Sequence, residues 1–249
     1  MTAPTDWWRT FFNGLAVEMW LQAMPEEVTQ CEADFVRKVL AVPAGAKLLD
    51  VPCGGGRHCL ALAARGYEMT GVDIAPEFLD AARTRAKESG LGIRWEEREM
   101  RDLPWEGEFD GSFCLGNSFG YLTDEGNAAF LKAVARSLKP GARFLINTGS
   151  LLETLMPTLQ ERAWINTGDC YFLPDRRYDP VTGRLEVVYT FIRGVQIETK
   201  PTSTRLYTYR EFHKLMEEAG FSDLEAYSSM NQEPFQYGAK QLFMAARRT

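Results

Sequence analysis

Residues 48–57 read Leu-Leu-Asp-Val-Pro-Cys-Gly-Gly-Gly-Arg, and residues 71–73 read Gly-Val-Asp. An apolar run thus ends in an acid, Asp50, and breaks into glycines, and a second acid, Asp73, follows 23 positions after the first. Glycines let the backbone approach a ligand closely, and an acid after the second strand accepts hydrogen bonds from ribose hydroxyls. The pattern predicts a nucleoside-binding site at the carboxyl ends of parallel strands.

Outward from this segment, strand and helix patterns alternate. Apolar runs predict five strands, at residues 47–51, 68–73, 93–97, 109–115 and 143–147. The helical patterns between them cover residues 56–65, 76–89 and 123–138. Such alternation predicts an α/β fold, with a mostly parallel sheet covered by helices on both faces, and we assign this core to residues 46–149.

Three further segments complete the chain. Residues 1–45 are predicted to form an N-terminal helical cap of two helices, because aromatic and apolar residues recur there at helical spacing. Residues 150–207 lose the alternation and contain β-rich stretches around a turn at 179–183, which predicts an antiparallel insertion acting as a lid over the acceptor. Residues 208–249 resume the core pattern with a closing helix and two strands.

Composition argues against several classes of partner. The chain has 249 residues, 45% hydrophobic and 25% charged, as is ordinary for one globular domain carrying an insertion. Lys and Arg total 28 against 34 Asp and Glu, and the net charge of −6 argues against a nucleic-acid partner. No apolar run reaches about 18 residues and no secretory leader is recognisable, so we expect a cytoplasmic protein with no membrane partner. The sequence leaves open whether the protein forms a homodimer.

The five cysteines form no Cys-x-x-Cys pair. Cys53 and Cys59 flank the glycine loop, but only His58 and His213 could join them as nitrogen ligands. We therefore expect reduced thiols and no metal site.

The glycine loop admits two cofactor interpretations. As a dinucleotide fingerprint, it would place Cys59 where a glycine or alanine is needed for close helix packing. As Asp-x-Gly-x-Gly-x-Gly, it has Asp50, Gly54 and Gly56 in place, with Pro52 at the first glycine. With this second spacing the chain resembles the class I S-adenosylmethionine-dependent methyltransferases over about residues 45–148 and the closing elements. The later pieces that carry the resemblance are Asp73, Glu99-Met100-Arg101-Asp102-Leu103-Pro104 and Leu115-Gly116-Asn117-Ser118-Phe119-Gly120-Tyr121.

The resemblance implies a Rossmann-like, seven-stranded, mostly parallel sheet, with S-adenosylmethionine as cofactor and S-adenosylhomocysteine as product. It implies that Asp73 binds both ribose hydroxyls and that Ile74 packs on adenine. Glu99 would accept a hydrogen bond from the adenine amine, while the Met100 N–H would meet a ring nitrogen. The full implied cofactor-binding set is Asp50, Pro52, Gly54, Gly56, Arg57, Asp73, Ile74, Glu99, Met100, Leu115 and Asn117.

The methionyl end of the cofactor receives the other implied roles. Asp50 would orient the loop or meet the methionyl amino group, to which Leu115 would offer its carbonyl. Arg57 would either meet the cofactor carboxylate or lie on the helix surface. Asn117 and Phe119 would border the methyl donor. One ring of the aromatic cluster at residues 7, 8, 11 and 12 would either close over the donor or belong to the core.

The acceptor site is predicted in less detail. A sulfonium is a good leaving group, so the protein mainly has to align acceptor, methyl and sulfur and exclude water. No catalytic residue is assigned, and Tyr121 and Tyr171 are candidates for a base. Segments 178–184 and 205–212 resemble the inserts of methyltransferases acting on amino sugars or glycine, which, with no base standing out, favours a nitrogen acceptor over oxygen. The predicted substrate-binding residues are Phe119, Tyr171, Tyr178, Arg193 and Arg205.

Two other function classes stay open at this point. A cyclase-like or regulatory relative would bind the cofactor without transferring methyl, and its cofactor half would look the same. A nicotinamide-dependent oxidoreductase is disfavoured by Cys59 and by the helical leader. The sequence therefore favours methyl transfer to a small or medium-sized organic acceptor.

Overall fold

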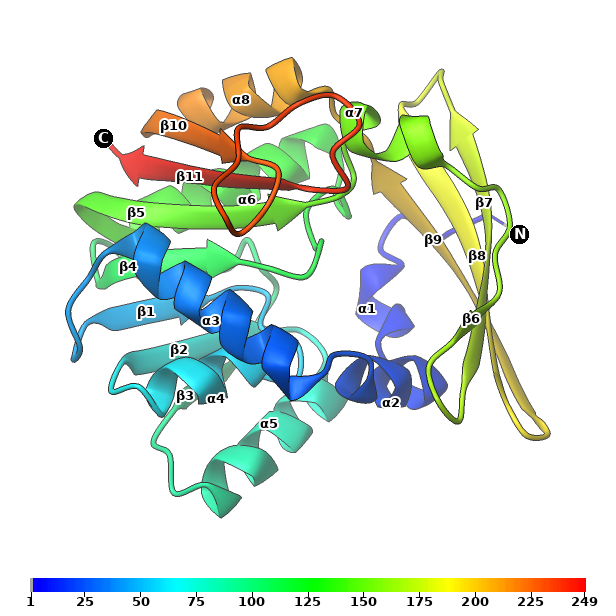
Figure 1. Ribbon diagram of the computed structural model, residues 1–249, viewed down its shortest axis with the longest axis horizontal. Helices are drawn as coiled ribbons and strands as arrows, with labels where there is room; N and C mark the ends of the chain where they lie inside the picture. The colour runs from blue at the N-terminus through cyan, green and yellow to red at the C-terminus, as the bar shows by residue number, and fades with distance from the viewer. Residues whose placement is uncertain (1) are drawn as a thin grey trace.

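A computed structural model describes residues 2–249. Its core is a seven-stranded sheet in the order β10-β11-β5-β4-β1-β2-β3, parallel except that β11 runs antiparallel to both of its neighbours (Figure 1). This confirms the predicted mostly parallel, Rossmann-like sheet. The strands are β1 (Lys47–Asp50), β2 (Glu68–Asp73), β3 (Arg94–Glu97), β4 (Phe109–Cys114), β5 (Leu138–Thr148), β10 (Phe221–Tyr227) and β11 (Leu242–Arg248).

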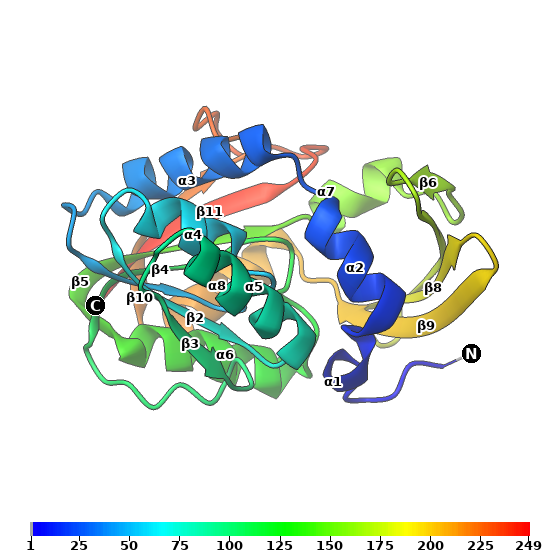
Figure 2. The ribbon, with the colours of Figure 1, turned by 90° about the horizontal axis from the view of Figure 1, so that it is seen from below.

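Helices cover both faces of this sheet, as predicted (Figure 2). Successive side chains of a strand point to opposite faces, so Leu48 packs with α3 and α4, while Leu49 packs on the side of α6 and α8. Both leucines are almost completely buried. The helices are α3 (Glu26–Leu40), α4 (Arg57–Ala63) and α5 (Pro76–Glu88) on the first side, and α6 (Asp124–Ser137) and α8 (Tyr209–Glu218) on the second.

The N-terminal segment differs from the prediction of two helices, because it contains three: α1 (Trp8–Phe11), α2 (Gly14–Gln22) and α3. The helical run is interrupted between α1 and α2, next to Gly14, whose φ of +56° lies in the left-handed region. The Gly14 nitrogen donates to Glu77 Oε2 of α5 at 3.0 Å. Helical periodicity continues through this break, so the aromatic spacing alone could not reveal it.

The predicted antiparallel insertion is a separate four-stranded sheet in the order β6-β7-β8-β9. It contains β6 (Ile165–Asn166), β7 (Tyr171–Asp179), β8 (Arg184–Arg193) and β9 (Gln196–Arg205), preceded by α7 (Leu152–Leu155) and the 3-10 helix η1 (Met156–Thr158). The sheet stands beyond the carboxyl ends of the core strands, with α1 and α2 beside it (Figures 1 and 2). We call this four-stranded sheet the lid sheet.

Side chains tie the lid sheet to the N-terminal helices. Trp7 Nε1 donates to the Ser203 carbonyl at 2.8 Å. Lys200 Nζ donates to the Asn13 carbonyl and to Asn13 Oδ1, both at 2.6 Å. These contacts join two segments that lie almost 200 residues apart in the sequence. We call α1, α2 and the lid sheet together the cover. Among residues 2–249, no helix is both long and apolar enough to cross a membrane.

Candidate cofactor and acceptor site

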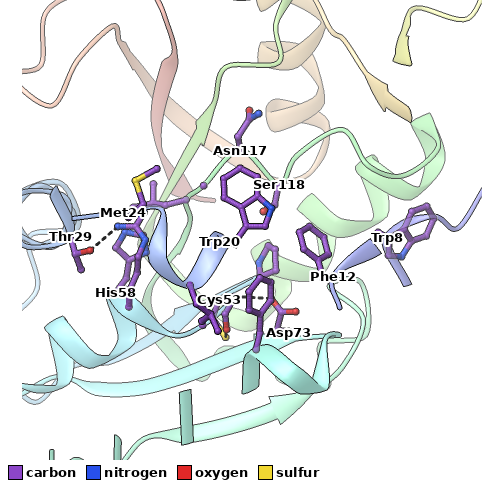
Figure 3. Close-up of a pocket in the computed structure, with 18 of the residues that line it drawn as sticks. Trp8, Phe12, Trp20, Met24, Thr29, Cys53, His58, Asp73, Asn117 and Ser118 are labelled. Atoms are coloured by element: carbon purple, nitrogen blue, oxygen red, sulfur yellow. Dashed lines mark hydrogen bonds between the residues drawn. The ribbon is translucent and has the colours of Figure 1, made fainter. Parts of the chain in front are cut away.

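A cavity of about 1010 Å³ lies between the carboxyl ends of the core strands and the cover (Figure 3). It opens where the strand order reverses between β1 and β4, which is the usual ligand position in open α/β sheets. Of the predicted cofactor residues, the cavity is lined by Pro52, Gly54, Arg57, Asp73, Ile74, Met100, Leu115 and Asn117. Asp50, Gly56 and Glu99 lie outside its lining.

The glycine loop passes closely against the end of β2. The Gly54 nitrogen donates to Asp73 Oδ2 at 2.7 Å. Gly54 and Gly56 have φ values of +53° and +72°. A Cβ at Gly56 would lie 2.4 Å from Cη2 of Trp95 and 2.9 Å from Cβ of Ala82. Both backbone conformation and space therefore require glycine at position 56.

Asp73 is 6% exposed and also accepts a hydrogen bond from the Ala75 nitrogen at 2.9 Å. Burial raises the pKa of its carboxyl to about 6, although the backbone donors of Ala75, Gly54 and Ile74 act in the opposite direction. At pH 7.5 the group is therefore an anion whose oxygens face the cavity, suited to accept hydrogen bonds from a diol.

Asp50 and Glu99 have protein partners of their own. Asp50 is 1% exposed and accepts from Cys59 Sγ at 3.3 Å, and burial raises its pKa to about 8. Glu99 Oε2 accepts from Arg101 Nε at 2.6 Å. Both carboxyls are thus engaged by other protein groups, and neither residue belongs to the cavity lining.

Arg57 reaches the cavity from the first turn of α4. It forms an ion pair with Glu32 of α3 and donates to Thr29 Oγ1 at 3.2 Å. His58 Nε2 lies 2.9 Å from Glu32 Oε2. Burial opposes ionisation of Glu32, but hydrogen bonds from His58 and Arg57 hold its pKa below the ordinary value. Burial lowers the pKa of His58, which favours its neutral form. The negative charge of Glu32 therefore balances the positive charge of Arg57 and not that of an imidazolium.

Asn117 joins the ends of β4 and β5 beside the cavity. Its φ of +67° lies in the left-handed region, which asparagine tolerates better than most residues. Its Oδ1 accepts from the Gly149 nitrogen at 2.7 Å and from Thr148 Oγ1 at 3.1 Å. The motif around Asn117 does not predict its contact with Gly149, because the two residues lie 32 positions apart in the sequence.

Tyr121 is the one predicted acceptor-side residue that lines the cavity. Its ring centroid lies 4.7 Å from that of Trp7 and 6.3 Å from that of Phe12. Burial raises the pKa of Tyr121 well above its usual range. The phenol is therefore a hydrogen-bond donor at physiological pH.

The other predicted acceptor residues lie outside the cavity lining. Phe119 packs between Tyr207 and Phe212, with ring centroids 5.5 and 4.9 Å away. Tyr171 is 45% exposed, and Tyr178 packs in a cluster with Leu185 and Leu206.

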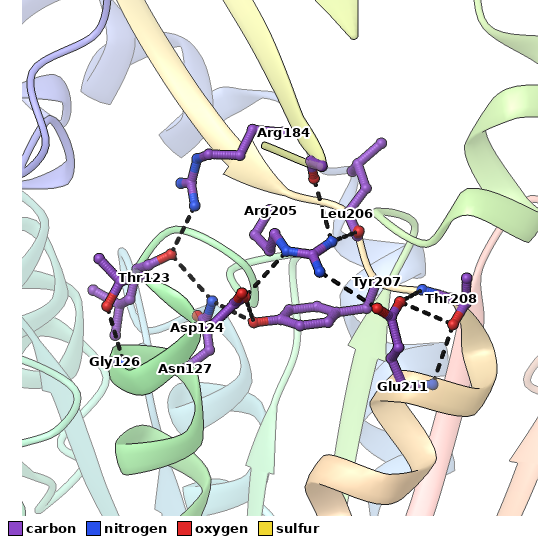
Figure 4. A network of polar contacts seen from close by, with 12 residues as sticks. Thr123, Asp124, Gly126, Asn127, Arg184, Arg205, Leu206, Tyr207, Thr208 and Glu211 are labelled. Atoms are coloured by element: carbon purple, nitrogen blue, oxygen red, sulfur yellow. Dashed lines mark hydrogen bonds and ion pairs between the residues drawn. The ribbon is translucent and has the colours of Figure 1, made fainter. Parts of the chain in front are cut away.

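The two predicted arginines hold parts of the cover in place. Arg193 pairs with Glu18 of α2 at 2.5 Å. Arg205 Nε donates to Asp124 Oδ1 at the start of α6 at 3.1 Å, within a polar network that joins the end of β9 to the core (Figure 4).

Several lining residues were absent from the predicted set. They come from the N-terminal segment 7–24, from the loop after β4 and from the inner face of the lid sheet, and include Trp7, Trp8, Phe11, Phe12, Trp20, Met24, Ser118, Arg176, Leu185, Val187, Tyr189, Thr202 and Thr204. All four residues of the N-terminal aromatic cluster, Trp7, Trp8, Phe11 and Phe12, line the cavity. Because successive side chains of a strand point to opposite faces, every second residue along 171–179 and 184–193 lies on the inner face of the lid sheet, and this period of two is the sequence signal for these lining residues.

This fold, with an acid-glycine loop after β1 and Asp73 at the end of β2, is that of the class I S-adenosylmethionine-dependent methyltransferases. Residues 48–141 match the family model described as a methyltransferase domain. Residues 48–141 thus correspond to a methyltransferase domain, and solved structures with this fold are S-adenosylmethionine-dependent methyltransferases.

Known proteins with similar sequences or structures agree with this class. A ubiquinone biosynthesis O-methyltransferase from Xanthomonas axonopodis pv. citri (strain 306) is 36% identical over 108 residues, 43% of this chain and 44% of that protein. The chain spans about half the length of the curated relatives it matches. The CcbJ methyltransferase from Streptomyces caelestis superposes with a TM-score of 0.82 at 17% identity, covering 97% of this chain and 99% of that one. The amino pentose methyltransferase CalS10 from Micromonospora echinaspora superposes with a TM-score of 0.64 at 22% identity, covering 90% and 91%.

Proposed function

We propose that this protein transfers the methyl group of S-adenosylmethionine to an amine nitrogen of a small or medium-sized organic molecule. The cofactor supplies a methyl sulfonium, and the chain has to align the acceptor with it and exclude water. In this proposal residues 46–149 and 208–249 bind the cofactor, while residues 1–45 and 150–207 enclose the acceptor. Asp73 holds the ribose, Ile74 and Met100 contact the adenine, and Gly54, Leu115 and Asn117 border the methionyl part.

The observation that carries the choice of nitrogen is the set of side chains at the acceptor end: the lining residues from α1, α2, the lid sheet and the loop that carries Tyr121 include no carboxylate and no imidazole. Tyr121 and Tyr189 line the cavity there, and burial raises the pKa of both phenols. Neither phenol can take up a proton at neutral pH. Because a neutral amine brings its own lone pair, it needs no base to attack the methyl group. We assign Tyr121 the role of orienting the amine by a hydrogen bond.

Oxygen is the second candidate acceptor atom, because the curated relative is an O-methyltransferase. CalS10, which is similar only in fold, is an amino pentose methyltransferase, and an amino sugar carries an amine. Turnover of S-adenosylmethionine carrying a ¹³C-methyl group, with a panel of matched amines and alcohols, separates the two. The carbon shift of the product distinguishes an N-methyl from an O-methyl group. Transfer to alcohols alone would exclude the nitrogen proposal.

Binding experiments test the cofactor part separately. S-adenosylhomocysteine should raise the melting temperature of the purified protein, because a ligand of the native state stabilises it by mass action, whereas NAD should not. A protein that binds S-adenosylhomocysteine but methylates no acceptor would favour the alternative of a cofactor-binding protein without transfer.

A further inference from the structure

The inner face of the lid sheet forms the acceptor wall of the cavity. The register places Val187 opposite both Arg176 of β7 and Thr202 of β9, so these three residues form one row across the sheet. Leu185 and Thr204 belong to the next row, nearer the core. Opposed residues of antiparallel strands lie about 5 Å apart on one face. Arg176 is therefore a cation set among apolar and hydroxyl side chains.

Arg176 has few partners within the protein. Its Nη1 donates to the Gln160 carbonyl at 3.0 Å, which fixes one end of the guanidinium. Across residues 2–249, no carboxylate oxygen lies within 4.0 Å of its nitrogens. A guanidinium has five N–H donors, so most of its hydrogen-bonding capacity is unused. Arg193 and Arg205, by contrast, are paired with Glu18 and Asp124.

Arg176 has apolar and phenol side chains beside it on the cavity side, while its hydrogen bond to the Gln160 carbonyl is exposed. The side chain is half-buried and lines the cavity together with Leu155, Val187 and Tyr189. The register places Tyr189 diagonally across from Arg176 on the same face of the sheet, and the positive charge of Arg176 opposes the rise that burial causes in the pKa of that phenol. A cation in such surroundings is favoured when an anion completes its hydrogen bonds.

We propose that Arg176 binds a carboxylate or phosphate of the methyl acceptor, so that the substrate is a ring-containing amine that carries an anionic group. The rings of Trp7, Phe11, Phe12 and Tyr121, which line the same cavity, provide flat surfaces for the ring of the acceptor. This inference rests on the proposed function, because it deepens the acceptor half of the same site. It makes Arg176 a specificity-determining residue.

The test uses small probes on the full chain loaded with S-adenosylhomocysteine. Benzoate and phenyl phosphate carry the two anionic groups on one ring, and benzamide is the neutral match. Calorimetric titrations are made on the wild type and on Arg176→Gln, Arg176→Lys and Arg177→Gln. Arg177 is exposed and lies on the opposite face of β7, so Arg177→Gln is the matched control.

At least one anion should bind the wild type and Arg177→Gln about tenfold more tightly than benzamide. That preference should disappear in Arg176→Gln and be partly kept in Arg176→Lys, which retains the charge but not the planar fork. Which anion binds more tightly distinguishes a carboxylate from a phosphate substrate.

The inference is overturned if S-adenosylhomocysteine binds and neither anion is preferred over benzamide, or if Arg176→Gln keeps the preference. Failure of the cofactor part of the proposed function gives a different result, since S-adenosylhomocysteine would then bind none of the four proteins. Failure of methyl transfer, or transfer to oxygen, appears in the turnover assay with the ¹³C-methyl cofactor and not in these titrations.

Discussion

The Asp73 carboxylate accepts backbone hydrogen bonds from Gly54 and Ala75 and still faces the cavity. We expect Asp73→Asn to weaken S-adenosylhomocysteine binding about 10- to 100-fold, because hydrogen bonds to a charged group contribute about 1.5–3 kcal/mol. Asp80→Asn, on the exposed side of α5, is the control and should bind like the wild type. Isothermal titration calorimetry at pH 7.5 measures both dissociation constants. Equal affinity in Asp73→Asn and wild type would remove Asp73 from the ribose site.

The pH dependence of binding should report the same carboxyl. Its pKa is raised to about 6 in the ligand-free protein, and only the anion accepts from both ribose hydroxyls. Below pH 6 a proton has to leave before the ligand binds, so the dissociation constant should rise by up to about tenfold per pH unit. Above pH 6 it should be flat. Asp73→Asn should lack the rise below pH 6.

Gly56 is the loop residue at which both the backbone conformation and the lack of space for a side chain require glycine. In Gly56→Ala the new Cβ meets Trp95 and Ala82, and the φ of +72° is strained for alanine. We expect a loss of about 2–4 kcal/mol in the free energy of unfolding, together with weaker cofactor binding. Gly90→Ala is the matched control, because Gly90 has a φ of +67° with no atom within 4 Å of its Cβ position. It should lose only about 1 kcal/mol and bind normally. Urea unfolding gives both values, and equal losses would show that the close approach to Trp95 does not matter.

At the scale of elements, the cover depends on the junction between α1 and α2. Lys200 of β9 donates to the carbonyls of Phe11 and Asn13 at that junction, and its side chain is only 14% exposed. In Lys200→Met these carbonyls lose their donor while the apolar stem is kept. We expect the unfolding free energy to fall by about 1–3 kcal/mol and amide exchange to accelerate in residues 8–22.

Lys38→Met tests whether any lysine loss has this effect, since Lys38 is exposed on α3. Hydrogen exchange followed by mass spectrometry compares the two variants. Unchanged exchange in residues 8–22 of Lys200→Met would mean that the hydrogen bonds of Lys200 do not hold α1 and α2 in place.

At the scale of the whole molecule, the sequence predicted the core better than the cover. A strand, its loop and the following helix are neighbours in the chain, so the loop motif and Asp73 could be located from local pattern. Alternation indicates which residues of β7 and β8 share a face, but the position of the lid sheet against the core decides that the face with Arg176 and Tyr189 lines the cavity, and no local pattern specifies that position. The position of Phe119, packed against Phe212, likewise depends on contact with α8 and not on its place in a motif.

The lid sheet is joined to the core by the polar network around Asp124. Arg205 Nε and Tyr207 Oη both donate to Asp124 Oδ1, at 3.1 and 2.7 Å, and the Arg205 guanidinium lies 4.5 Å from the centroid of the Tyr207 ring (Figure 4). The backbone N–H of Arg205 also donates to the Gly120 carbonyl, at an N···O distance of 2.8 Å. This network fixes the end of β9 beside the loop that carries Tyr121, so we interpret Arg205 as a positioning residue for the lid sheet.

Arg205→Gln should therefore lower kcat/KM for the acceptor about tenfold or more, because small misplacements of bound reactants slow transfer, while the dissociation constant of S-adenosylhomocysteine stays within about twofold. Asp124→Asn should give a similar loss. The double variant should be no worse than either single one, since both remove the same contact. Arg210→Gln, on the exposed start of α8, should behave like the wild type. If the two losses multiply in the double variant, Arg205 acts on the acceptor independently of Asp124, and the sequence-based assignment of Arg205 to substrate binding would be preferred over a positioning role.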